Sequence, residues 1–407
     1  MLKIFYSFYN IVFITIYYLT LPFVFILVKL KYLSQDFLEY YGFTDLKELH
    51  NKSIWFHCAS IGELKSITEL INIIKKEFPY LNIVVTTVTI DGKKMAQKEI
   101  KGSINFLLPI ENTKAIQKII HKCDVKLLFI VETELWPNLI NCASQYCKLF
   151  LINARMTQSS FKKYKLLSFI FKDLLHKFCR IYTKSAYDKN LIEKIYEKKL
   201  EYTGNTKFNN LEVKVDKDII DTFKNKKCLL LASTHNGEES FFIKYAYKYI
   251  DKFDYVIIAP RHINRIGKIE QLLKKYNYPV AVFSINKNFK KFIIIDVYGL
   301  MDSFYAISSK IFVGGSLVNV GGHNIYEALR LKKFIAVGPF MNNFIDIYEL
   351  ALFYGLIHTI NNIDDFLNYL NNNERKEELF NYFFSELENK NKKTLNHILS
   401  TIKNEIK

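Results

Sequence analysis

Short apolar runs alternate along most of the chain with longer segments in which apolar residues recur at helical spacing. Ten apolar runs predict β-strands, at residues 54–58, 83–87, 105–108, 127–131, 149–152, 228–232, 255–259, 292–295, 311–313 and 334–337. Continuous apolar strands separated by helices are typical of parallel sheets that helices cover on both faces. The pattern therefore predicts an α/β protein built from two Rossmann-like domains.

The N-terminus departs from this alternation. No charged residue occurs from Ile4 to Val28, and lysines stand at positions 3, 29 and 31. A helix of this length can cross a hydrocarbon core of about 30 Å. We predict that residues 1–33 form a single N-terminal membrane anchor, although several tyrosines, Asn10 and Pro22 leave open a helix lying partly in the interface. The flanking lysines predict that the body lies on the cytoplasmic side.

The remaining length suits two domains of ordinary size. The stretch 198–227 is polar, contains the turn Gly204-Asn205 and reads as a linker. We therefore predict an N-terminal domain at 34–203 and a C-terminal domain at 204–407. The tail after Asn371 is charged and helical in period, and we expect its last helix to pack back on the N-terminal domain.

The chain is strongly basic, with a formal net charge of +17. This charge favours an anionic membrane surface or anionic substrate, but a lysine-rich habit spread over the whole chain explains it equally well. No segment resembles a basic recognition helix or an aromatic-basic RNA motif, so we expect no nucleic acid partner. The six cysteines form no CxxC pair, which suits buried thiols in a reducing compartment and excludes an obvious zinc site or disulfide framework.

Acids follow two of the predicted strands in the first half. Glu63 comes after the turn "ASIG", and Glu132 and Glu134 open the stretch "ETELWPN". Ligands of parallel sheets bind beyond the carboxyl ends of the strands, where a carboxylate can act as a base. The alternatives are a helix-start acid favoured by the dipole for Glu63 and hydrogen-bonded structural carboxylates for the pair. Arg155 follows the next strand and adds a polar group there.

The second half carries signals of anion binding. Arg261 follows a strand in "APRHINR", where its paired donors suit a phosphate or carboxylate. The segment 312–329, "FVGGSLVNVGGHNIYEAL", reads as a strand, a glycine loop and a helix start, so we predict that bare amides at the helix start bind an anion. Glu327 lies one helical turn after His323 and can accept hydrogen bonds from a ribose diol. Lys207, in the hinge, can meet an anion.

Acids at strand ends in one half and an anion site in the other predict a glycosyltransferase of the GT-B type. Its two parallel sheets are expected to face each other across a cleft, with the nucleotide on the C-terminal domain and the acceptor on the N-terminal domain. The residues alone take the prediction no further.

The order of the motifs resembles a known family. The series is "HCASIGE", "ETELWPN", "NARMTQSS", "GNTKF", "STHNGEE", "PRHINR", "FVGGSLVNVGGHNIYE" and "GPFMNNF". These motifs resemble, in their order, the signatures of the 3-deoxy-D-manno-octulosonic acid (Kdo) transferase family, over residues from about 30 to 355. The resemblance implies transfer of Kdo from CMP-Kdo to the anionic lipid A precursor, at the cytoplasmic face of the inner membrane, with inversion and without a metal or other cofactor.

The resemblance also implies roles for individual residues. Glu63 matches the family's catalytic base, and Glu134 and Lys207 match the residues credited with supporting the transition state. The matching CMP contacts are Pro260, Arg261, the segment 298–301 with Gly299, Leu300 and Met301, and the segment 324–327 with Asn324, Ile325, Tyr326 and Glu327.

One residue departs from the family pattern. The family commonly reads "GEL" where this chain has "GLM", so Leu300 replaces an acid, and only a backbone contact survives there. Three alternatives remain at this point: a GT-B enzyme using a UDP-sugar for another envelope glycan, a sugar-nucleotide epimerase of the same fold, and a non-catalytic membrane-associated binding protein.

Overall fold

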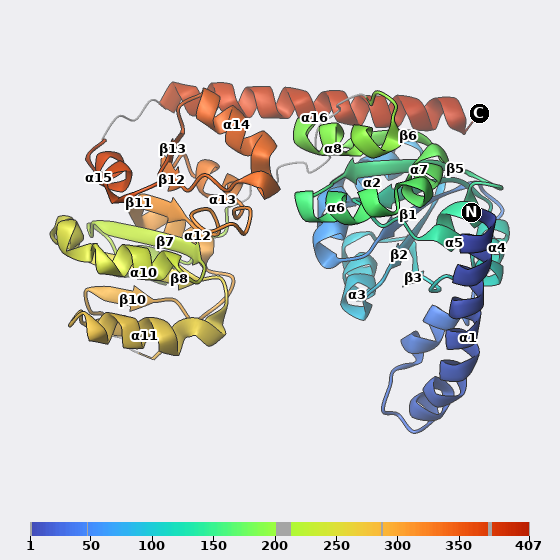
Figure 1. Cartoon of the computed structure of the whole chain (residues 1–407), viewed down its shortest axis with the longest axis horizontal. Helices are drawn as coiled ribbons and strands as arrows, with labels where there is room; N and C mark the ends of the chain where they lie inside the picture. The colour runs from blue at the N-terminus through green and yellow to red at the C-terminus, as the bar shows by residue number, and fades with distance from the viewer. Residues whose placement is uncertain (1, 47, 201–212, 286–287, 373–376, 407) are drawn as a thin grey trace. The chain divides into compact units, whose positions relative to one another are not determined.

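The computed structural model describes residues 2–46, 48–200, 213–285, 288–372 and 377–406 (Figure 1). The chain divides into two compact units, of which the first comprises residues 1–209 and 388–407 and the second residues 210–387. Each unit contains a twisted parallel sheet covered by helices on both faces.

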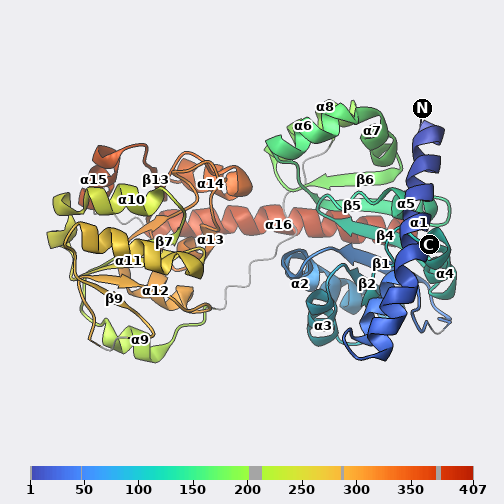
Figure 2. The ribbon, with the colours of Figure 1, turned by 60° about the horizontal axis from the view of Figure 1, so that its bottom comes forward.

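The first unit holds a six-stranded parallel sheet (Figure 2). Its strands are β1 (Ser53–Cys58), β2 (Asn82–Thr87), β3 (Ile104–Leu107), β4 (Val125–Val131), β5 (Lys148–Ala154) and β6 (Phe178–Thr183). Its helices are α1 (Leu2–Lys29), η1 (Gln35–Tyr41), α2 (Ile61–Glu77), α3 (Ile90–Glu99), α4 (Thr113–Lys122), α5 (Pro137–Ala143), α6 (Gln158–Leu166), α7 (Ser168–His176) and α8 (Ala186–Tyr196). The strand order β3-β2-β1-β4-β5-β6 reverses direction between β1 and β4, which makes that point the expected ligand site.

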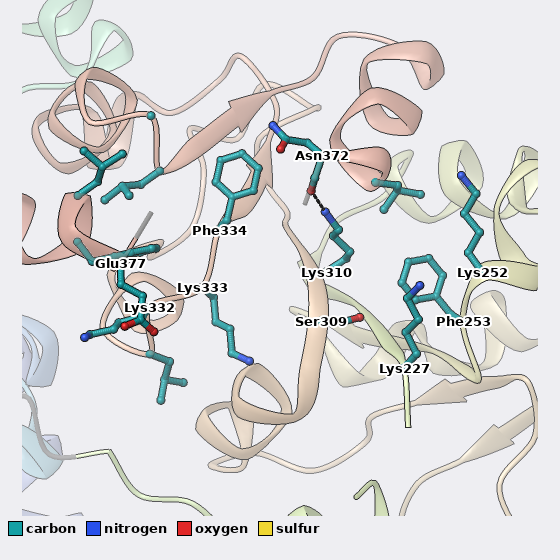
Figure 3. A pocket seen from close by; sticks show the side chains of 16 residues that line it. Lys227, Lys252, Phe253, Ser309, Lys310, Lys332, Lys333, Phe334, Asn372 and Glu377 are labelled. Carbon is teal, nitrogen blue, oxygen red and sulfur yellow. Dashed lines mark hydrogen bonds between the residues drawn. The ribbon is translucent and has the colours of Figure 1, made fainter. Parts of the chain in front are cut away.

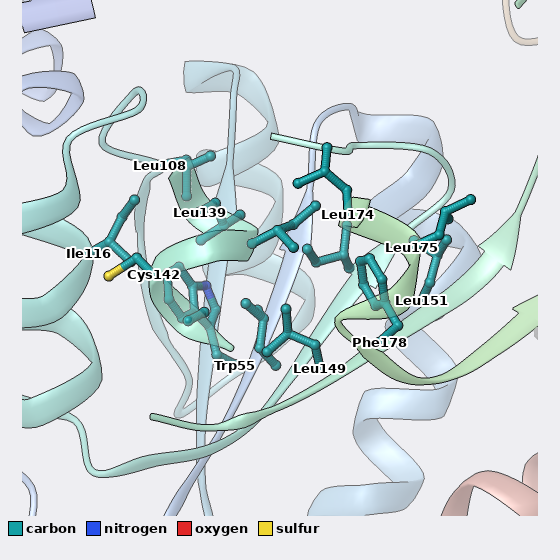
Figure 4. Close-up of a cluster of buried hydrophobic side chains, with 14 of the residues drawn as sticks. Trp55, Leu108, Ile116, Leu139, Cys142, Leu149, Leu151, Leu174, Leu175 and Phe178 are labelled. Carbon is teal, nitrogen blue, oxygen red and sulfur yellow. The ribbon is translucent and has the colours of Figure 1, made fainter. Parts of the chain in front are cut away.

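Two apolar layers sandwich this sheet, because every residue of β1 is buried and successive side chains point to opposite faces. Trp55 belongs to the layer that includes Leu139 of α5 and Leu174 of α7, and Figure 4 shows this cluster. Phe56 belongs to the opposite layer, which includes Ile67 of α2. The run "SIWFHC" is therefore buried along its whole length, because its two faces serve two cores.

Helix α1 is the one described helix that is long and apolar enough to cross a membrane, with a mean hydropathy of 2.5 in its most apolar window. Its outer side carries large exposed residues such as Phe8 (66%) and Phe23 (68%). Its other side contacts the first unit: the Tyr6 hydroxyl donates to Asp173 Oδ2 at 2.8 Å and the Tyr17 hydroxyl to the Tyr41 carbonyl at 3.1 Å. The tyrosines that weaken the pattern of a membrane span are thus the residues that dock the helix.

The second unit holds a seven-stranded parallel sheet. Its strands are β7 (Cys228–Thr234), β8 (Tyr255–Pro260), β9 (Val280–Val282), β10 (Phe292–Ile294), β11 (Ser308–Val313), β12 (Ile335–Val337) and β13 (Ile357–Thr359). Its helices are α9 (Lys217–Thr222), α10 (Glu238–Lys244), η2 (Ala246–Lys248), η3 (Ile250–Lys252), η4 (Ile263–Arg265), α11 (Ile266–Lys275), α12 (Met301–Ile307), α13 (Tyr326–Leu329), η5 (Asn342–Phe344), α14 (Ile345–Phe353) and α15 (Ile363–Asn371). The order β13-β12-β11-β7-β8-β10-β9 reverses between β7 and β11.

Helix α16 (Glu377–Glu405) belongs to both units, since the division falls between Leu387 and Glu388. Near its start, Phe383 is buried in the core of the second unit. Near its end, Ile398 and Ile402 are buried in the core of the first unit.

All ten predicted strands are present, and their ends lie within three residues of the predicted ones. The sequence pattern missed β6, β9 and β13. Strand β6 lies at the sheet edge, where Cys179 and Arg180 are exposed and interrupt its apolar run. Strands β9 and β13 have 3 residues each and lie at the two edges of the second sheet.

Candidate active site

The structure brings the acids of the first unit together. Glu63 follows β1, while Glu132 and Glu134 follow β4, and these two strands are neighbours at the point where the strand order reverses. The charges of Glu132 and Glu134 both act on Glu63, so the three carboxylates share one environment. The predicted grouping of acids at this edge of the sheet is present.

Glu63 is held at the start of α2 by a capping arrangement. Ser60 is the N-cap residue, and its hydroxyl accepts from the Glu63 amide at 3.3 Å and contacts Glu63 Oε1 at 3.0 Å as donor. The Ala59 amide donates to Glu63 Oε2 at 2.6 Å. The pair Ser60 and Glu63 thus follows the spacing of a capping box. The structural role fixes the carboxylate in place, which any chemical role requires.

Burial raises the pKa of Glu63 to about 7. The hydrogen bonds from Ala59 and Ser60 lower this pKa, and the negative charges of Glu132 and Glu134 raise it. The side chain is nearly buried, with an exposed fraction of 9%. A carboxyl group with a pKa near neutrality is suited to accept a proton from a weakly acidic hydroxyl at physiological pH.

Glu134 is fixed by its own motif. The Trp136 indole N–H donates to Glu134 Oε2 at 2.9 Å, and burial is the main cause that raises the pKa of Glu134, with Glu132 adding to it. Glu132 has a φ of 57°, a conformation that non-glycine residues rarely adopt, and its Oε1 lies 3.8 Å from Lys184 Nζ. The "ETE" loop therefore holds two carboxylates at a strained strand end beside Glu63.

Two other predicted residues of this half have different outcomes. Arg155 lies after β5 on the same sheet edge, and its carbonyl accepts from the Thr133 hydroxyl, which ties it to the "ETE" loop. Lys207 lies outside the described residues, so its role stays a prediction.

In the second unit, Pro260 ends β8 and Arg261 follows it at the carboxyl edge of the sheet. The Arg261 amide donates to the Thr234 carbonyl at 3.0 Å, which joins the loops after β7 and β8. Its side chain is exposed and makes no hydrogen bond or ion pair with any residue that the structure describes. The guanidinium is available to an anion.

The first part of the glycine loop after β11 does not offer bare amides. The Glu238 carboxylate accepts from the amides of Gly315 (2.8 Å), Ser316 (3.0 Å) and Leu317 (2.9 Å). Glu238 is fully buried, and its Oε2 also accepts from the His235 amide at 2.8 Å. These three amides are not an open anion site, because the protein supplies its own carboxylate there. The predicted anion site at the helix start, where α13 begins at Tyr326, stays a prediction.

The segment 324–327 is preorganised by internal hydrogen bonds. The Asn324 side-chain amide donates to Glu327 Oε1 at 3.0 Å, and the Tyr326 amide donates to Asn324 Oδ1 at 3.2 Å. Ile325 is buried in the core of the second unit. The Glu327 carboxylate is oriented by Asn324, and whether it holds a ribose stays a prediction.

The segment 298–301 precedes and opens α12. Tyr298 is 73% exposed, and Gly299 has a φ of 87° with open space where a Cβ would stand. Leu300 and Met301 pack against the core of the second unit. An apolar residue at position 300 thus has a packing partner here.

The described residues also form a basic pocket at the opposite, amino-terminal edge of this sheet (Figure 3). Its lysines are Lys227, Lys252, Lys310, Lys332 and Lys333. Three of them are bonded to the protein's own oxygens: Lys310 to the Tyr369 carbonyl (3.0 Å), Lys333 to the Ala306 carbonyl (2.7 Å) and Lys252 to Asn371 Oδ1 (2.7 Å). This pocket is distinct from the loops that carry Arg261.

Residues 35–210 match the family model described as 3-deoxy-D-manno-octulosonic-acid transferase (kdotransferase). The 3-deoxy-D-manno-octulosonic acid transferase of Rickettsia bellii is 31% identical to this chain over 365 residues, which cover 86% of this chain and 87% of that protein. The chain belongs to the Kdo transferase family. The family predicted from the order of the motifs is confirmed.

The chain is also similar to a longer protein, and its fold is found in other enzymes. A bifunctional glycosyltransferase/methyltransferase of Fusobacterium nucleatum is 33% identical over 88% of this chain, and this chain spans only 57% of its length. The UDP-GlcNAc 2-epimerase of Methanocaldococcus jannaschii aligns with a TM-score of 0.53 and 18% identity, over 80% of this chain and 94% of that protein. At that identity the likeness shows the GT-B type fold alone.

Two of the Kdo transferase motifs also contribute residues that the sequence pattern did not single out as site residues. His235 of "STHNGEE" and His262 of "PRHINR" lie with His323 at the carboxyl edge of the second sheet, and the His235 and His323 rings are stacked at 4.9 Å. The available signal was their position after β7, β8 and β11, which are adjacent strands.

Proposed function

We propose that this Kdo transferase moves Kdo from CMP-Kdo to the lipid A precursor, as an inverting glycosyltransferase that needs no metal. The observation that carries the proposal is a carboxylate with a pKa of about 7, Glu63, at the switch point of the first sheet, in a chain that belongs to this family.

Glu63 is the base of the proposed reaction. A hydroxyl of the acceptor attacks the anomeric carbon of Kdo, its proton passes to the Glu63 carboxylate, and the bond from that carbon to the phosphate oxygen breaks. Attack on the face opposite the leaving nucleotide inverts the anomeric centre. A positioned base contributes about 10²–10⁴-fold to such a rate. Glu134 and Lys207 are proposed to stabilise the positive charge and the departing phosphate, respectively.

The second unit is proposed to bind the donor. CMP gains negative charge as it leaves, and Arg261 offers a cation without a partner carboxylate among the described residues. The amides of residues 315–317 are not available for this purpose, because Glu238 occupies them. Pro260, Arg261 and the segments 298–301 and 324–327 therefore remain as the proposed CMP contacts.

We propose that α1 places the enzyme on the cytoplasmic face of the inner membrane. The exposed apolar residues of its outer side, Phe8 and Phe23 among them, support contact with lipid. An anionic lipid acceptor gives the net charge of +17 a function at that surface, and no nucleic acid partner is proposed.

The test is incubation of the full chain with CMP-Kdo and tetraacylated lipid A precursor, followed by mass spectrometry. Products heavier by one or more Kdo residues, with and without a metal chelator, are the expected result. A parallel reaction with UDP-sugars tests the competing donor class, and transfer from a UDP-sugar but not from CMP-Kdo would overturn the proposal.

A further inference from the structure

Two histidines meet at the switch point of the second sheet. His235 lies in the loop after β7 and His323 in the loop after β11, and these strands are neighbours where the strand order reverses. Ligands of such sheets bind in the crevice at this point. Arg261 and His262 follow β8, the next strand on the other side of β7. Adjacent strands thus deliver imidazoles and a guanidinium to the same edge.

The two imidazoles are in direct contact. His235 Nε2 lies 2.7 Å from His323 Nε2, and the ring planes are inclined by only 16°. The packing is specific, because a Cβ at position 315 would lie 2.9 Å from the His323 ring, so glycine is needed there. Since the two Nε2 atoms cannot both donate to each other, they share one proton, and the pair carries at most one positive charge while this bond lasts.

Some of the charged groups around the histidine pair have a hydrogen-bonded partner and others do not. Arg265 is paired with Glu239, with Nη1 and Oε1 at 2.9 Å, and the Glu238 carboxylate is satisfied by backbone amides. Arg261 and His262 also face the pair and have no such carboxylate partner among the described residues. The surroundings therefore favour a negatively charged ligand and disfavour a second proton.

We propose that the His235–His323 pair receives the phosphate of the nucleotide donor and takes up one proton as the phosphate binds. This rests on the proposed function, which supplies a CMP-linked donor, and it assigns the phosphate to side chains in place of the occupied glycine-loop amides. In this proposal both histidines contact the phosphate and hold it as it departs.

The proton linkage follows from the environment of the free pair. Burial lowers the pKa of His323 to about 4, and it lowers the pKa of His235 as well, with His262 and Arg261 adding to both effects. The charge of Glu238 acts against this shift at His235 but does not outweigh burial. The free pair is therefore neutral at pH 7. A phosphate beside it favours the protonated form, so binding takes up a proton, and affinity falls as the pH rises until the bound pair loses that proton.

Calorimetry with CMP as the probe tests the proposal. Titrations at pH 7.5, in two buffers that differ in ionisation enthalpy, give the number of protons taken up; at this pH the phosphate of CMP is already a dianion. We expect uptake approaching one proton per CMP in the wild type. His323→Gln should reduce the uptake to near zero and weaken CMP binding about tenfold or more. Cytidine, which lacks the phosphate, should bind without uptake and equally to both proteins.

His358→Gln is the matched control, because His358 lies on β13 in the same unit and its ring contacts Tyr369. It should leave CMP affinity and proton uptake unchanged. Nitrogen-15 NMR of the wild-type histidines provides a reading that needs no variant, and His235 or His323 should shift to imidazolium values when CMP is added.

The outcomes separate the two proposals. If the wild type transfers Kdo and binds CMP without proton uptake, or if His323→Gln keeps both affinity and uptake, the histidine proposal is wrong and the proposed function stands. If CMP does not bind to the wild type at all, the donor assignment falls and the histidine proposal falls with it.

Discussion

The two sheets use the same topology to build opposite electrostatic environments. In the first unit the strand order reverses between β1 and β4, and the loops there bring together the carboxylates of Glu63, Glu132 and Glu134. In the second unit the order reverses between β7 and β11, and the loops there bring together His235, His323 and, from β8, Arg261.

The comparison shows that the topology supplies the place and the loops supply the chemistry. Crowded, buried carboxylates raise the pKa of Glu63 to about 7, whereas crowded, buried imidazoles near an arginine lower the pKa of His323 to about 4. Both groups are held neutral for much of the time at pH 7. One site is thereby suited to take a proton from an acceptor and the other to meet an anion.

The largest expected effect is the loss of turnover when Glu63, in the acidic loops of the first unit, is replaced. Glu63→Gln keeps the shape of the side chain but removes the proton acceptor, so turnover should fall at least about a hundredfold while CMP affinity stays within about twofold. Kdo transfer by mass spectrometry and calorimetry with CMP measure the two quantities. Glu69→Gln, on an exposed position of the same helix α2, is the control. Near-normal turnover in the Glu63→Gln enzyme would refute the base assignment.

The same substitution should stabilise the fold at alkaline pH. The pKa of Glu63 is about 7 in the folded protein and about 4.5 when unfolded, so the folded state holds the proton more tightly. Stability from this group is therefore present below the unfolded pKa and lost as the pH rises through about 7, by up to about 3 kcal/mol.

Denaturant unfolding of wild type and Glu63→Gln at pH 5 and pH 8 measures this effect. From pH 5 to pH 8, the free energy of unfolding of the variant should increase relative to that of the wild type. Glu111 also has a pKa raised to about 7 by burial, but it is present in both proteins and cancels in the difference. If the difference in free energy of unfolding between variant and wild type is the same at pH 5 and pH 8, folding does not raise the pKa of Glu63.

In the second unit, Arg261→Ala should weaken the binding of CMP. The guanidinium has no partner among the described residues, so its removal should cost a ligand contact and little stability. We expect CMP binding to weaken about tenfold or more, measured by calorimetry. Lys268→Ala, on an exposed position of α11, is the control for loss of one positive charge. Equal CMP affinity in Arg261→Ala and wild type would remove Arg261 from the donor site.

The sequence was sufficient for the placement of Glu63, Glu134 and Arg261, because continuous apolar strands locate their own carboxyl ends. It was insufficient for the glycine loop. Glu238 and Glu239 are adjacent and identical in type, yet the first enters the loop of residues 315–317 and the second pairs with Arg265. The partner of each glutamate depends on which loop lies beside which strand. The local sequence pattern does not predict this.

Edge strand β6 shows the other limit of the sequence. Arg180 stands in the middle of Phe178–Thr183, because the outer side of an edge strand meets solvent and α16. The Arg180 guanidinium contacts His397 Nε2 of α16 at 2.7 Å, a partner more than two hundred residues away in the chain. A polar residue that contacts a helix distant in the sequence interrupts the apolar run, so the local sequence pattern does not predict the strand.

The smallest expected effect is a shift in the pH dependence of kcat/KM when Glu132, a carboxylate beside Glu63, is replaced. The rate constant kcat/KM should fall tenfold per pH unit below about pH 7, since Glu63 must be ionised to accept a proton. Of the two neighbouring carboxylates, Glu132 raises the pKa of Glu63 more than Glu134 does, so Glu132→Gln should move the midpoint of this pH profile to lower pH. Glu193→Gln is a matched control, because Glu193 lies 3.8 Å from Lys189 just as Glu132 lies 3.8 Å from Lys184. A profile that keeps its midpoint in Glu132→Gln, or that moves equally in Glu193→Gln, would mean that the crowding of carboxylates does not set the proton affinity of Glu63. In that case burial alone would distinguish the acidic loops of the first unit from the imidazole loops of the second.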